Sequence, residues 1–302
     1  MKVVITGAGG MVGSDLTLRL SSRHKVLGVG RRPAPHLRVP FFELDLSQAK
    51  KVRDLWQAEK PEVVLHAAAM TEVDLCETER QAALTDNLDI TRNVTDASND
   101  VGAWILFFST DFVFDGKKKG PYEESDPPNP VSVYGETKLL GERYVSLKGK
   151  QFVILRASWV FGVHGDNFPQ KILRQAEAGK TIRVVSDEFG NPTYTWDLAG
   201  AVEEVLGLIQ KGFFRQGNQT YHVTNEGTVS RFDFARAILK GRNCPDGLLL
   251  PVLRSEVRYP AARPQNSALS TEKIKTNLGI RLRPWEKALE DYLGKIPEGL
   301  RR

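Results

Sequence analysis

The sequence predicts an α/β protein with a doubly wound, Rossmann-like parallel sheet and a smaller C-terminal α/β lobe. Two observations carry this prediction. Short apolar runs alternate with helical patterns as far as about Arg156, as expected for a series of βαβ units. The first run, Lys2–Thr6, is followed at once by a glycine-rich turn and then by a helical pattern with leucines at positions 16 and 20. Beyond residue 157 the alternation loosens into polar, loop-like segments.

Composition limits the class of protein. Of the 302 residues, 41% are hydrophobic and 26% are charged, which is typical of soluble globular domains. No apolar run approaches the roughly 18 residues that a membrane helix needs. Because the N-terminus enters a strand directly, we expect no signal peptide. Cys76 and Cys244 form neither a disulfide framework nor a metal-ligand spacing. We therefore expect a cytoplasmic location and no membrane partner.

The net charge of +5 raises the question of nucleic-acid binding. The tightest basic clusters are Arg31-Arg32, Lys117–Lys119 and Arg301-Arg302. None of them is interleaved with aromatic residues or laid along a single helix face, as a nucleic-acid-binding stripe would be. The sequence therefore predicts a solvated basic surface and no nucleic-acid partner. A mild positive field also suits a small anionic ligand such as a nucleotide.

The turn after the first strand has the pattern of a phosphate-binding loop. Gly7, Gly10 and Gly13 recur every three residues between the strand and the helical pattern, and Met11 and Val12 complete the turn. This is the arrangement of dinucleotide-binding folds, in which the glycines permit the tight turn, the approach of the pyrophosphate and close helix–strand packing. The phosphates would lie at the helix N-terminus, where unpaired N–H groups and the helix dipole favour negative charge. The alternative is a chance glycine-rich loop.

The end of the second strand indicates which dinucleotide binds. The run Lys25–Val29 is followed by Gly30, Arg31 and Arg32, where an NAD site usually has an acidic residue that bonds the ribose 2′-hydroxyl. A guanidinium suits a 2′-phosphate instead. We therefore expect NADPH as the cofactor, with NADH possible. The alternative is an exposed arginine loop before Pro33.

Two later strand ends would border the rest of the cofactor. Asp45 and Leu46 end the short run that begins at Phe41, and Asp45 either accepts from the adenine amine or caps the next helix at Ser47. The strand Glu62–His66 precedes three small residues, Ala67, Ala68 and Ala69, which would let a nicotinamide ribose pass close to the backbone. We interpret His66 as a packed core histidine. A long helix is expected from about Glu79 to Asp100.

A phenol and an ammonium lie four residues apart in the segment Tyr134-Gly-Glu-Thr-Lys138. If the chain is helical after Pro130, both side chains lie on one helix face. The ammonium should then lower the pKa of Tyr134, which would make the phenol a proton donor or acceptor near neutral pH. Thr110, just after the buried strand Trp104–Phe108, could bind the same carbonyl oxygen. The alternative is a surface tyrosine beside a solvated lysine.

Taken together, these segments resemble the extended short-chain dehydrogenase/reductases, and more closely the dTDP-4-dehydrorhamnose reductase family. The segments that carry the resemblance span almost the whole chain: Gly7/Gly10/Gly13, His66–Ala69 with Val73-Asp74, Asn87, Ser109–Phe114, Tyr134–Lys138, Arg156–Val160, Phe189–Thr193 and Arg263–Ser267. The glycines and the Tyr-x-x-x-Lys element are shared across the superfamily. Trp159 and the Arg-Pro-x-Asn-Ser element are narrower signals.

The resemblance implies NADPH-dependent reduction of the C4 keto group of dTDP-4-dehydro-6-deoxy-L-mannose to dTDP-L-rhamnose, by a monomer or a homodimer. Tyr134 would protonate the developing alkoxide, and Lys138 would hold the ribose hydroxyls. Thr110 would donate a hydrogen bond to the same oxygen. Residues 1–160, together with some later segments, would bind NADP, and residues 161–302 would mainly bind the sugar nucleotide. The expected substrate contacts are Thr71, Val73, Asp74, Thr110, Asp111, Phe112, Trp159, Asn191, Arg263 and Asn266.

The chain departs from the family pattern at several positions. Phe112 stands where the family commonly has tyrosine, and Asn191 replaces a residue that is often small. The acidic magnesium site through which some relatives dimerise has no match here, so we expect no metal. Trp159 could instead be a core aromatic residue.

Two other functions compete with the reductase. One is an NADP-binding regulatory subunit of the methionine adenosyltransferase type, whose members lack a tryptophan at the position of Trp159. The other is a different sugar-nucleotide reductase or epimerase on the same fold.

Overall fold

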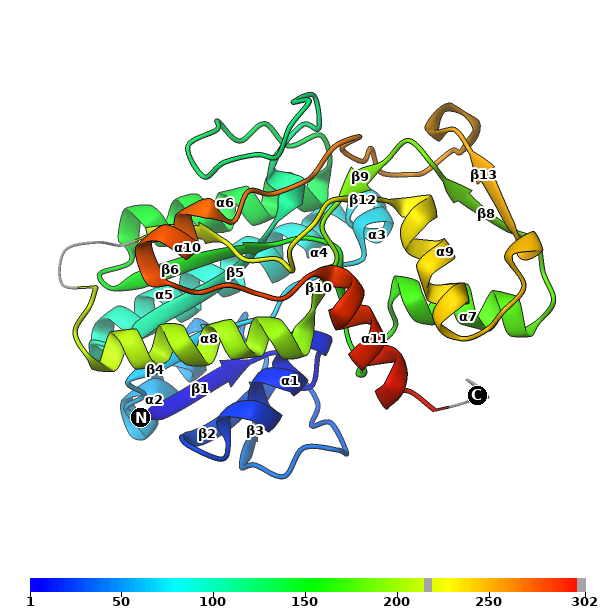
Figure 1. Cartoon of the computed structure of the whole chain (residues 1–302). Helices are drawn as coiled ribbons and strands as arrows, with labels where there is room; N and C mark the ends of the chain where they lie inside the picture. Colours follow the sequence, from blue (N-terminus) through cyan, green and yellow to red (C-terminus); the bar gives the residue numbers. More distant parts are fainter. Residues whose placement is uncertain (215–218, 298–302) are drawn as a thin grey trace.

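The computed structural model describes residues 1–214 and 219–297, so the Arg301-Arg302 cluster lies outside it. A seven-stranded sheet has the order β11-β6-β5-β4-β1-β2-β3, and every neighbouring pair in it is parallel (Figure 1). Its strands are β1 (Lys2–Thr6), β2 (Lys25–Gly30), β3 (Phe41–Glu43), β4 (Val63–His66), β5 (Trp104–Thr110), β6 (Phe152–Ala157) and β11 (Gln219–His222). The order reverses between β1 and β4, which is where ligands bind in open α/β sheets.

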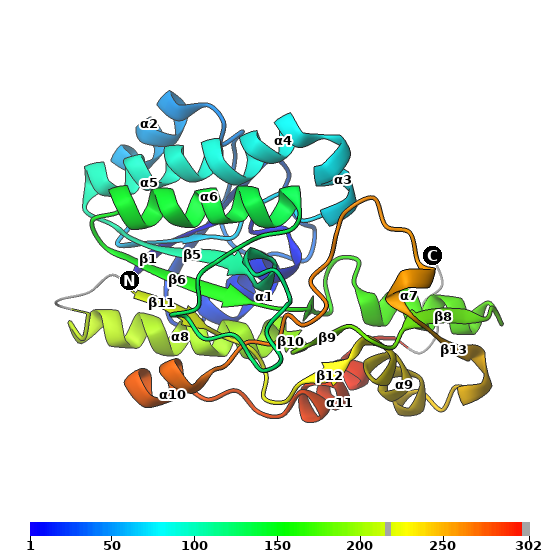
Figure 2. The same ribbon diagram turned by 90° about the horizontal axis from the view of Figure 1, so that it is seen from above.

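Helices cover both faces of this sheet, so the doubly wound prediction is confirmed. In Figure 2, α2 (Ala49–Glu59), α5 (Ile90–Val101) and α6 (Val133–Lys148) lie along one face and α8 (Thr195–Gln210) lies along the other. The helix α1 (Met11–Leu20) packs against α8. Each face has its own apolar core. On one face the core contains leucines of α1 together with alanines and valines of α8. On the other face it contains residues of α2 and α5.

The second half of the chain forms the smaller lobe at the right of Figure 1 but also returns to the large sheet. β11 pairs with β6, and α8 packs on α1. The main helices of the smaller lobe are α7 (Phe168–Glu177), α9 (Arg231–Gly241) and α11 (Trp285–Lys295). Its paired strands are β7 (Val160–Phe161) with β10 (Thr193–Tyr194), β8 (Ile182–Val185) with β13 (Leu249–Val252), and β9 (Phe189–Gly190) with β12 (Val229–Ser230). The shorter helical elements are α3 (Val73–Thr78), α4 (Arg80–Leu84), η2 (Asp111–Val113), η3 (Asp246–Leu248), η4 (Arg254–Glu256) and α10 (Glu272–Leu278).

The long helix expected from about Glu79 to Asp100 is present, because α4, a π-helical turn at Thr85–Asp89 and α5 follow one another without a break; the π turn within it was not predicted. The buried amide of Asn87 gives the physical reason. Its Oδ1 accepts from the Met70 N–H at 2.8 Å, and its Nδ2 donates to the Met70 carbonyl at 3.1 Å and to Thr137 at 3.0 Å. The wider turn directs this amide at the chain after β4 and at α6.

The first turn of α6 lies unusually close to the end of β5. Ser132 caps the helix by accepting from the Gly135 N–H at 3.2 Å. A Cβ atom at Gly135 would lie 2.1 Å from the Phe112 carbonyl oxygen, a separation that no real side chain tolerates. Only glycine therefore allows α6 to contact η2, which follows β5 directly.

A buried ion pair fastens the middle of α6 to the sheet. The guanidinium of Arg156, on β6, donates from Nε to Glu142 Oε1 at 2.9 Å and from Nη2 to Oε2 at 2.7 Å. Both side chains are almost fully buried, at 6% and 5% exposed. On the β11 side, the ring of His222 lies 3.4 Å from Arg156 Nη1. This bidentate geometry satisfies charges that would be costly to bury alone.

We predict that Gly135→Ala lowers the free energy of unfolding by at least about 2 kcal/mol, because the new methyl group overlaps the Phe112 carbonyl. Gly207→Ala in α8 is the matched control. It adds the same atom where nothing lies within 4 Å, and should stabilise the chain by about 0.5–1 kcal/mol. Urea denaturation of both variants measures the difference. Equal effects at the two positions would show that α6 can move away from η2 at little cost.

We predict that Glu142→Ala lowers the free energy of unfolding by about 3–5 kcal/mol, because it leaves the Arg156 guanidinium buried without a partner. Replacing both residues with methionine should cost much less, since no charge then remains buried. The comparison is made by denaturation at neutral pH. A double variant as unstable as Glu142→Ala would mean that packing, rather than charge, sets the loss.

Candidate active site

A cleft of about 460 Å³ lies at the carboxyl ends of the central strands, where the large sheet meets the smaller lobe. The glycine turn after β1, the alanines after β4, the end of β5 and the start of α6 form its walls on the sheet side. Most of the site residues predicted from the sequence line it: Gly7, Gly10, Met11, Val12, Gly13, Ala67, Ala69, Thr71, Val73, Thr110, Asp111, Phe112, Tyr134, Lys138, Trp159 and Arg263.

The glycine turn has the backbone geometry that phosphate-binding loops need. Gly7 has a φ of +67°, and a Cβ atom there would lie 2.8 Å from the Ala68 Cα. A Cβ atom at Gly13 would lie 2.1 Å from the Gly7 carbonyl oxygen, so only glycine lets α1 pack this close to the turn. No side chain caps α1 at Gly10, and the helix therefore presents an N-terminus that suits an anion.

Tyr134 and Lys138 lie on α6, one turn apart, and both line the cleft together with Thr110. The expected lowering of the Tyr134 pKa is wrong for this structure. Burial raises the pKa of Tyr134, and a hydrogen bond with Thr110 opposes that rise only in part. The Lys138 ammonium lies over the ring of Phe107, 4.2 Å from its centroid. Burial lowers the pKa of Lys138 to about 8, and the Glu142 carboxylate opposes this shift.

Two buried oxygen atoms beside this trio lack hydrogen-bond partners among residues 1–214 and 219–297. They are Ser109 Oγ and Asp111 Oδ2, and both residues line the cleft. The other carboxyl oxygen of Asp111 accepts from Thr110 Oγ1 at 3.0 Å. Burial raises the pKa of Asp111 to about 6, with Ser267, Thr110 and Arg231 opposing the rise. Unpaired buried polar atoms cost free energy, so their presence here fits a polar ligand.

Trp159 has a strained backbone and a cation on its ring. Its φ of +43° lies in the left-handed region, which costs a non-glycine residue about 1–3 kcal/mol and often marks a functional site. The Arg231 guanidinium lies 3.5 Å from the ring centroid. A Cβ atom at Gly190 would lie 2.4 Å from the indole, so glycine is required against it. Trp159 is therefore a fixed part of the cleft wall.

Arg231 is the most informative residue that the sequence analysis missed. It begins α9, lines the cleft and forms no ion pair within 4.0 Å in the described part of the chain. Desolvation lowers the pKa of its guanidinium to about 10, and the carboxylates of Glu188 and Asp111 oppose this shift. An arginine that opens into a cleft without a carboxylate partner suits an anionic ligand. No short motif marks it, since only the fold brings the start of α9 to this place.

Other cleft residues were also missed: Phe108, Ser109, Ala157, Val160, Asp166, Asn167, Phe168, Lys171 and Leu198. Phe108, Ser109 and Ala157 lie at the ends of β5 and β6, and Val160 follows Trp159, so the strand pattern could have found these four. Asp166 to Lys171 surround the start of α7, where Asn167 caps the helix by accepting from the Gln170 N–H at 3.2 Å. The side chain of Lys171 pairs with Asp166 at 3.2 Å.

Four of the cofactor-binding residues predicted from the sequence lie outside the lining of the cleft. Arg31 is 74% exposed and pairs with Asp86 at 3.3 Å. Asp45 accepts from the Ser47 N–H at 3.0 Å in the turn that leads into α2, and Leu46 is buried in the core. Ala68 lies behind Gly7. His66 is buried between Thr6, at 2.7 Å, and Thr91, at 3.1 Å, as expected for a core histidine.

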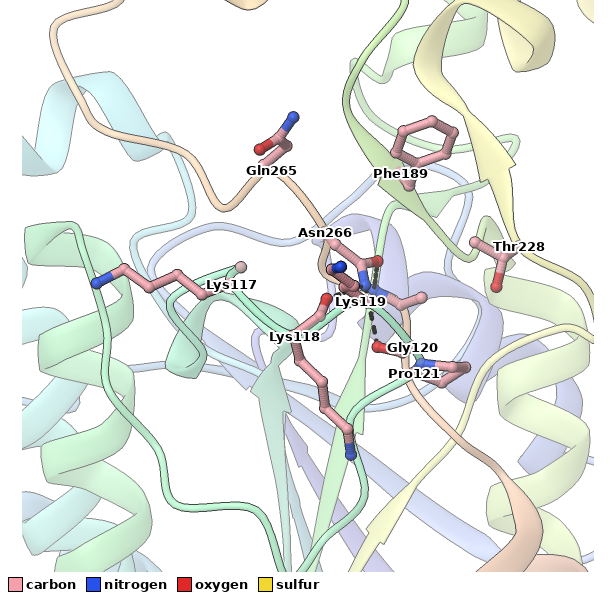
Figure 3. Close-up of a pocket in the computed structure, with 11 residues that line it drawn as sticks. Lys117, Lys118, Lys119, Gly120, Pro121, Phe189, Thr228, Gln265 and Asn266 are labelled. Carbon is pink, nitrogen blue, oxygen red and sulfur yellow. Dashed lines mark hydrogen bonds between the residues drawn. The ribbon is translucent and has the colours of Figure 1, made fainter.

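Three expected substrate contacts, Asp74, Asn191 and Asn266, lie outside the lining of the cleft and bind neighbouring segments instead. Asp74 pairs with Arg263 at 2.8 Å and so positions the guanidinium that lines the cleft. The Asn191 amide donates to the Gly227 carbonyl at 2.8 Å and accepts from the Leu269 N–H at 2.7 Å. Asn266 lies in a second pocket of about 630 Å³, where its amide donates to the carbonyls of Lys118 at 2.7 Å and Gly120 at 3.0 Å (Figure 3).

Residues 1–214 and 219–297 include no helix that is long and apolar enough to cross a membrane. In the same residues, no three histidine, cysteine, aspartate or glutamate side chains come together as metal ligands.

Comparison with known proteins identifies the family. The family model for the RmlD substrate binding domain matches residues 1–297. A dTDP-4-dehydrorhamnose reductase from Burkholderia thailandensis is 35% identical over 96% of this chain and 97% of its own length. The spore coat polysaccharide biosynthesis protein SpsK of Bacillus subtilis is 36% identical over 97% and 96%. The crystal structure of a Bacillus anthracis dTDP-4-dehydrorhamnose reductase in complex with NADP has a TM-score of 0.87 at 32% identity, and the match covers 97% of this chain and 99% of that one. The chain therefore belongs to the RmlD family, that of the dTDP-4-dehydrorhamnose reductases, which are NAD(P)-dependent oxidoreductases.

Proposed function

We propose that this chain reduces the C4 keto group of dTDP-4-dehydro-6-deoxy-L-mannose to dTDP-L-rhamnose with NADPH. One observation carries the proposal: a single cleft joins the glycine turn, the Thr110–Tyr134–Lys138 trio and the Trp159–Arg231 pair. The glycine turn suits a pyrophosphate, and the trio suits proton transfer to a carbonyl. The Trp159–Arg231 pair suits a sugar attached to phosphates. In this proposal residues 1–160, with the returning segments, bind NADP, and residues 161–302 mainly bind the sugar nucleotide.

The cofactor would lie along the carboxyl edge of the sheet. Its pyrophosphate would meet the N-terminus of α1, and its nicotinamide ribose would pass Ala67, Ala68 and Ala69 towards Lys138. Asp45 and Leu46 would border the adenine. Arg31, which is exposed at the end of β2, would face the 2′-phosphate. When bound, the nicotinamide supplies the hydride.

The residues of this chain would supply the proton and the stabilising charges. Hydride arrival at C4 turns the carbonyl oxygen into an alkoxide, and the Tyr134 hydroxyl gives it a proton to form the secondary alcohol. Because burial raises the pKa of Tyr134, the phenol keeps its proton until that charge develops. The Lys138 ammonium would stabilise the resulting phenolate, and the Thr110 hydroxyl would donate to the same substrate oxygen.

The far end of the cleft would hold the sugar nucleotide. The Trp159 ring presents an apolar face of fixed orientation, and the Arg231 and Arg263 guanidinium groups suit the pyrophosphate. Thr71, Val73, Asp111 and Phe112 would contact the sugar. Asp74, Asn191 and Asn266 would act through the wall segments that they hold in place.

An assay separates this function from its two rivals. NADPH oxidation followed at 340 nm with the dTDP-sugar, generated in a coupled reaction, supports the reductase. Tight NADPH binding without oxidation would favour the regulatory-subunit alternative, and oxidation with another sugar nucleotide would favour a different reductase. The proposal includes a cytoplasmic location and no nucleic-acid or membrane partner. Size-exclusion chromatography distinguishes the monomer from the homodimer.

We predict that Tyr134→Phe lowers kcat by about two to three orders of magnitude, because it removes the proton donor while keeping the ring. The NADPH Kd, measured by fluorescence titration, should stay within about threefold of the wild-type value, as the hydroxyl is not needed for the pyrophosphate or the adenine. Near-wild-type turnover by this variant would contradict the proton-donor role.

We predict that Arg31→Ala lowers kcat/KM for NADPH about tenfold and leaves that for NADH nearly unchanged, since only NADPH has a 2′-phosphate. Arg92→Ala is the control, because Arg92 is also an exposed arginine that pairs with a nearby aspartate, Asp89, at 3.0 Å. Steady-state kinetics with both cofactors gives the ratio. An unchanged ratio in Arg31→Ala would remove Arg31 from the cofactor site.

A further inference from the structure

The Thr110 hydroxyl has one hydrogen, and the structure already gives it a partner. The Phe112 N–H donates to Thr110 Oγ1 at 3.2 Å and thereby occupies one of the two lone pairs of this oxygen. Oγ1 itself lies 3.0 Å from Asp111 Oδ1, to which it donates when the carboxyl is ionised. In that state Thr110 can face Tyr134 or a substrate carbonyl only as an acceptor. The transition state, however, requires a donor at this position.

Protonation of Asp111 reverses the direction of this hydrogen bond. A neutral carboxyl has a hydrogen of its own and can donate it to Thr110 Oγ1. The threonine hydrogen is then free to point into the cleft. Thr110 occupies the C-terminal end of β5 and is 5% exposed, so it has no bulk water with which to exchange this hydrogen bond.

The surroundings of Asp111 shift its protonation equilibrium towards the neutral carboxyl. The side chain is 2% exposed, and its Oδ2 has no hydrogen-bond partner in the described residues. The charged and titratable groups that act on it are Arg231 at the start of α9 and Tyr134 on α6, with the Ser267 hydroxyl also facing it. Glu188 acts on the same guanidinium and so reduces its effect. Burial outweighs the stabilising groups and brings the pKa of Asp111 to about 6.

We propose that Asp111 is a positioning residue: its neutral carboxyl turns the Thr110 hydroxyl towards the substrate carbonyl, and its ionisation turns that hydroxyl away. The inference rests on the proposed function, because it concerns the hydrogen bond that the developing alkoxide receives. It assigns Asp111 a role beyond contact with the sugar. It also makes the reductase sensitive to pH at a carboxyl group that does not itself transfer the proton to the product.

The first test compares the pH dependence of kcat in the wild type and in Asp111→Asn, from about pH 5 to pH 8. In the wild type, kcat should fall about tenfold as Asp111 ionises, since one hydrogen bond to the alkoxide is lost. The asparagine amide donates to Thr110 at every pH. The kcat of the variant should therefore not fall with rising pH across this range, and NADPH binding should be little changed, whereas KM for the sugar nucleotide should rise because the carboxyl that contacts the sugar is replaced.

The second test uses Thr110→Ala, alone and together with Asp111→Asn. Without the hydroxyl, the fall in kcat near the pKa of Asp111 should disappear, and adding Asp111→Asn should have no further effect on kcat. Strong non-additivity of this kind shows that the two residues act as a unit. A merely structural Asp111 would give losses that add, together with a lower melting temperature and weaker NADPH binding.

Each outcome decides between the alternatives. An Asp111→Asn profile that still falls as in the wild type, or a low kcat at every pH with NADPH still bound, overturns the positioning role. If Asp111→Asn does not fold, the Thr110→Ala profile decides alone, because a fall that persists without the hydroxyl overturns the proposal. A wild type that binds NADPH but reduces no sugar nucleotide overturns the proposed function and this inference together. If the wild type reduces the sugar nucleotide but the pH profile of kcat in Asp111→Asn matches that of the wild type, only the inference is overturned.

Discussion

The close contact between α6 and the end of β5 is the constraint on which the site depends. It exists because Gly135 has no Cβ atom to collide with the Phe112 carbonyl. The contact places Thr110, on a strand, beside Tyr134, on a helix 24 residues later in the chain. The strand and the helix are both rigid, so the two hydroxyls meet in a fixed geometry that no mobile loop has to maintain. The sheet order then brings the glycine turn to the same edge.

The charges of the site are linked to the core of the sheet. Burial lowers the pKa of the Lys138 ammonium, and Glu142, one helical turn further along α6, opposes this shift. Glu142 is itself held by Arg156 of β6, and Arg156 contacts the His222 ring on β11. Burial lowers the pKa of His222 to about 3, so this histidine adds no positive charge near neutral pH. The strand β11 therefore contacts this chain of ion pairs through a neutral ring, and the charge that acts on Lys138 comes from Glu142.

The sequence was informative wherever a local pattern has a direct physical consequence. Strand periodicity, the three glycines and the one-turn spacing of Tyr134 and Lys138 depend on neighbours in the chain, and the structure has those elements. The π turn at Thr85–Asp89 could not be predicted, because its cause is the contact of Asn87 with Met70 and Thr137. The same holds for Arg231, whose importance comes from its place above Trp159. The pKa of Tyr134 was predicted with the wrong sign, since spacing reveals a charged neighbour but not the extent of burial.

The path of the chain has a consequence for its biosynthesis. β11 is the edge strand next to β6, and α8 covers the face of the sheet that also carries α1. A ribosome therefore releases the glycine turn and the Tyr134–Lys138 helix well before the residues that complete the same core, which come from α8 and β11 and extend as far as Leu282. Until then the nascent polypeptide exposes the edge of β6 and an apolar face, both of which favour aggregation. The first half of this chain thus lacks the helix and the strand that cover one face and one edge of its own sheet, and both come from the second half.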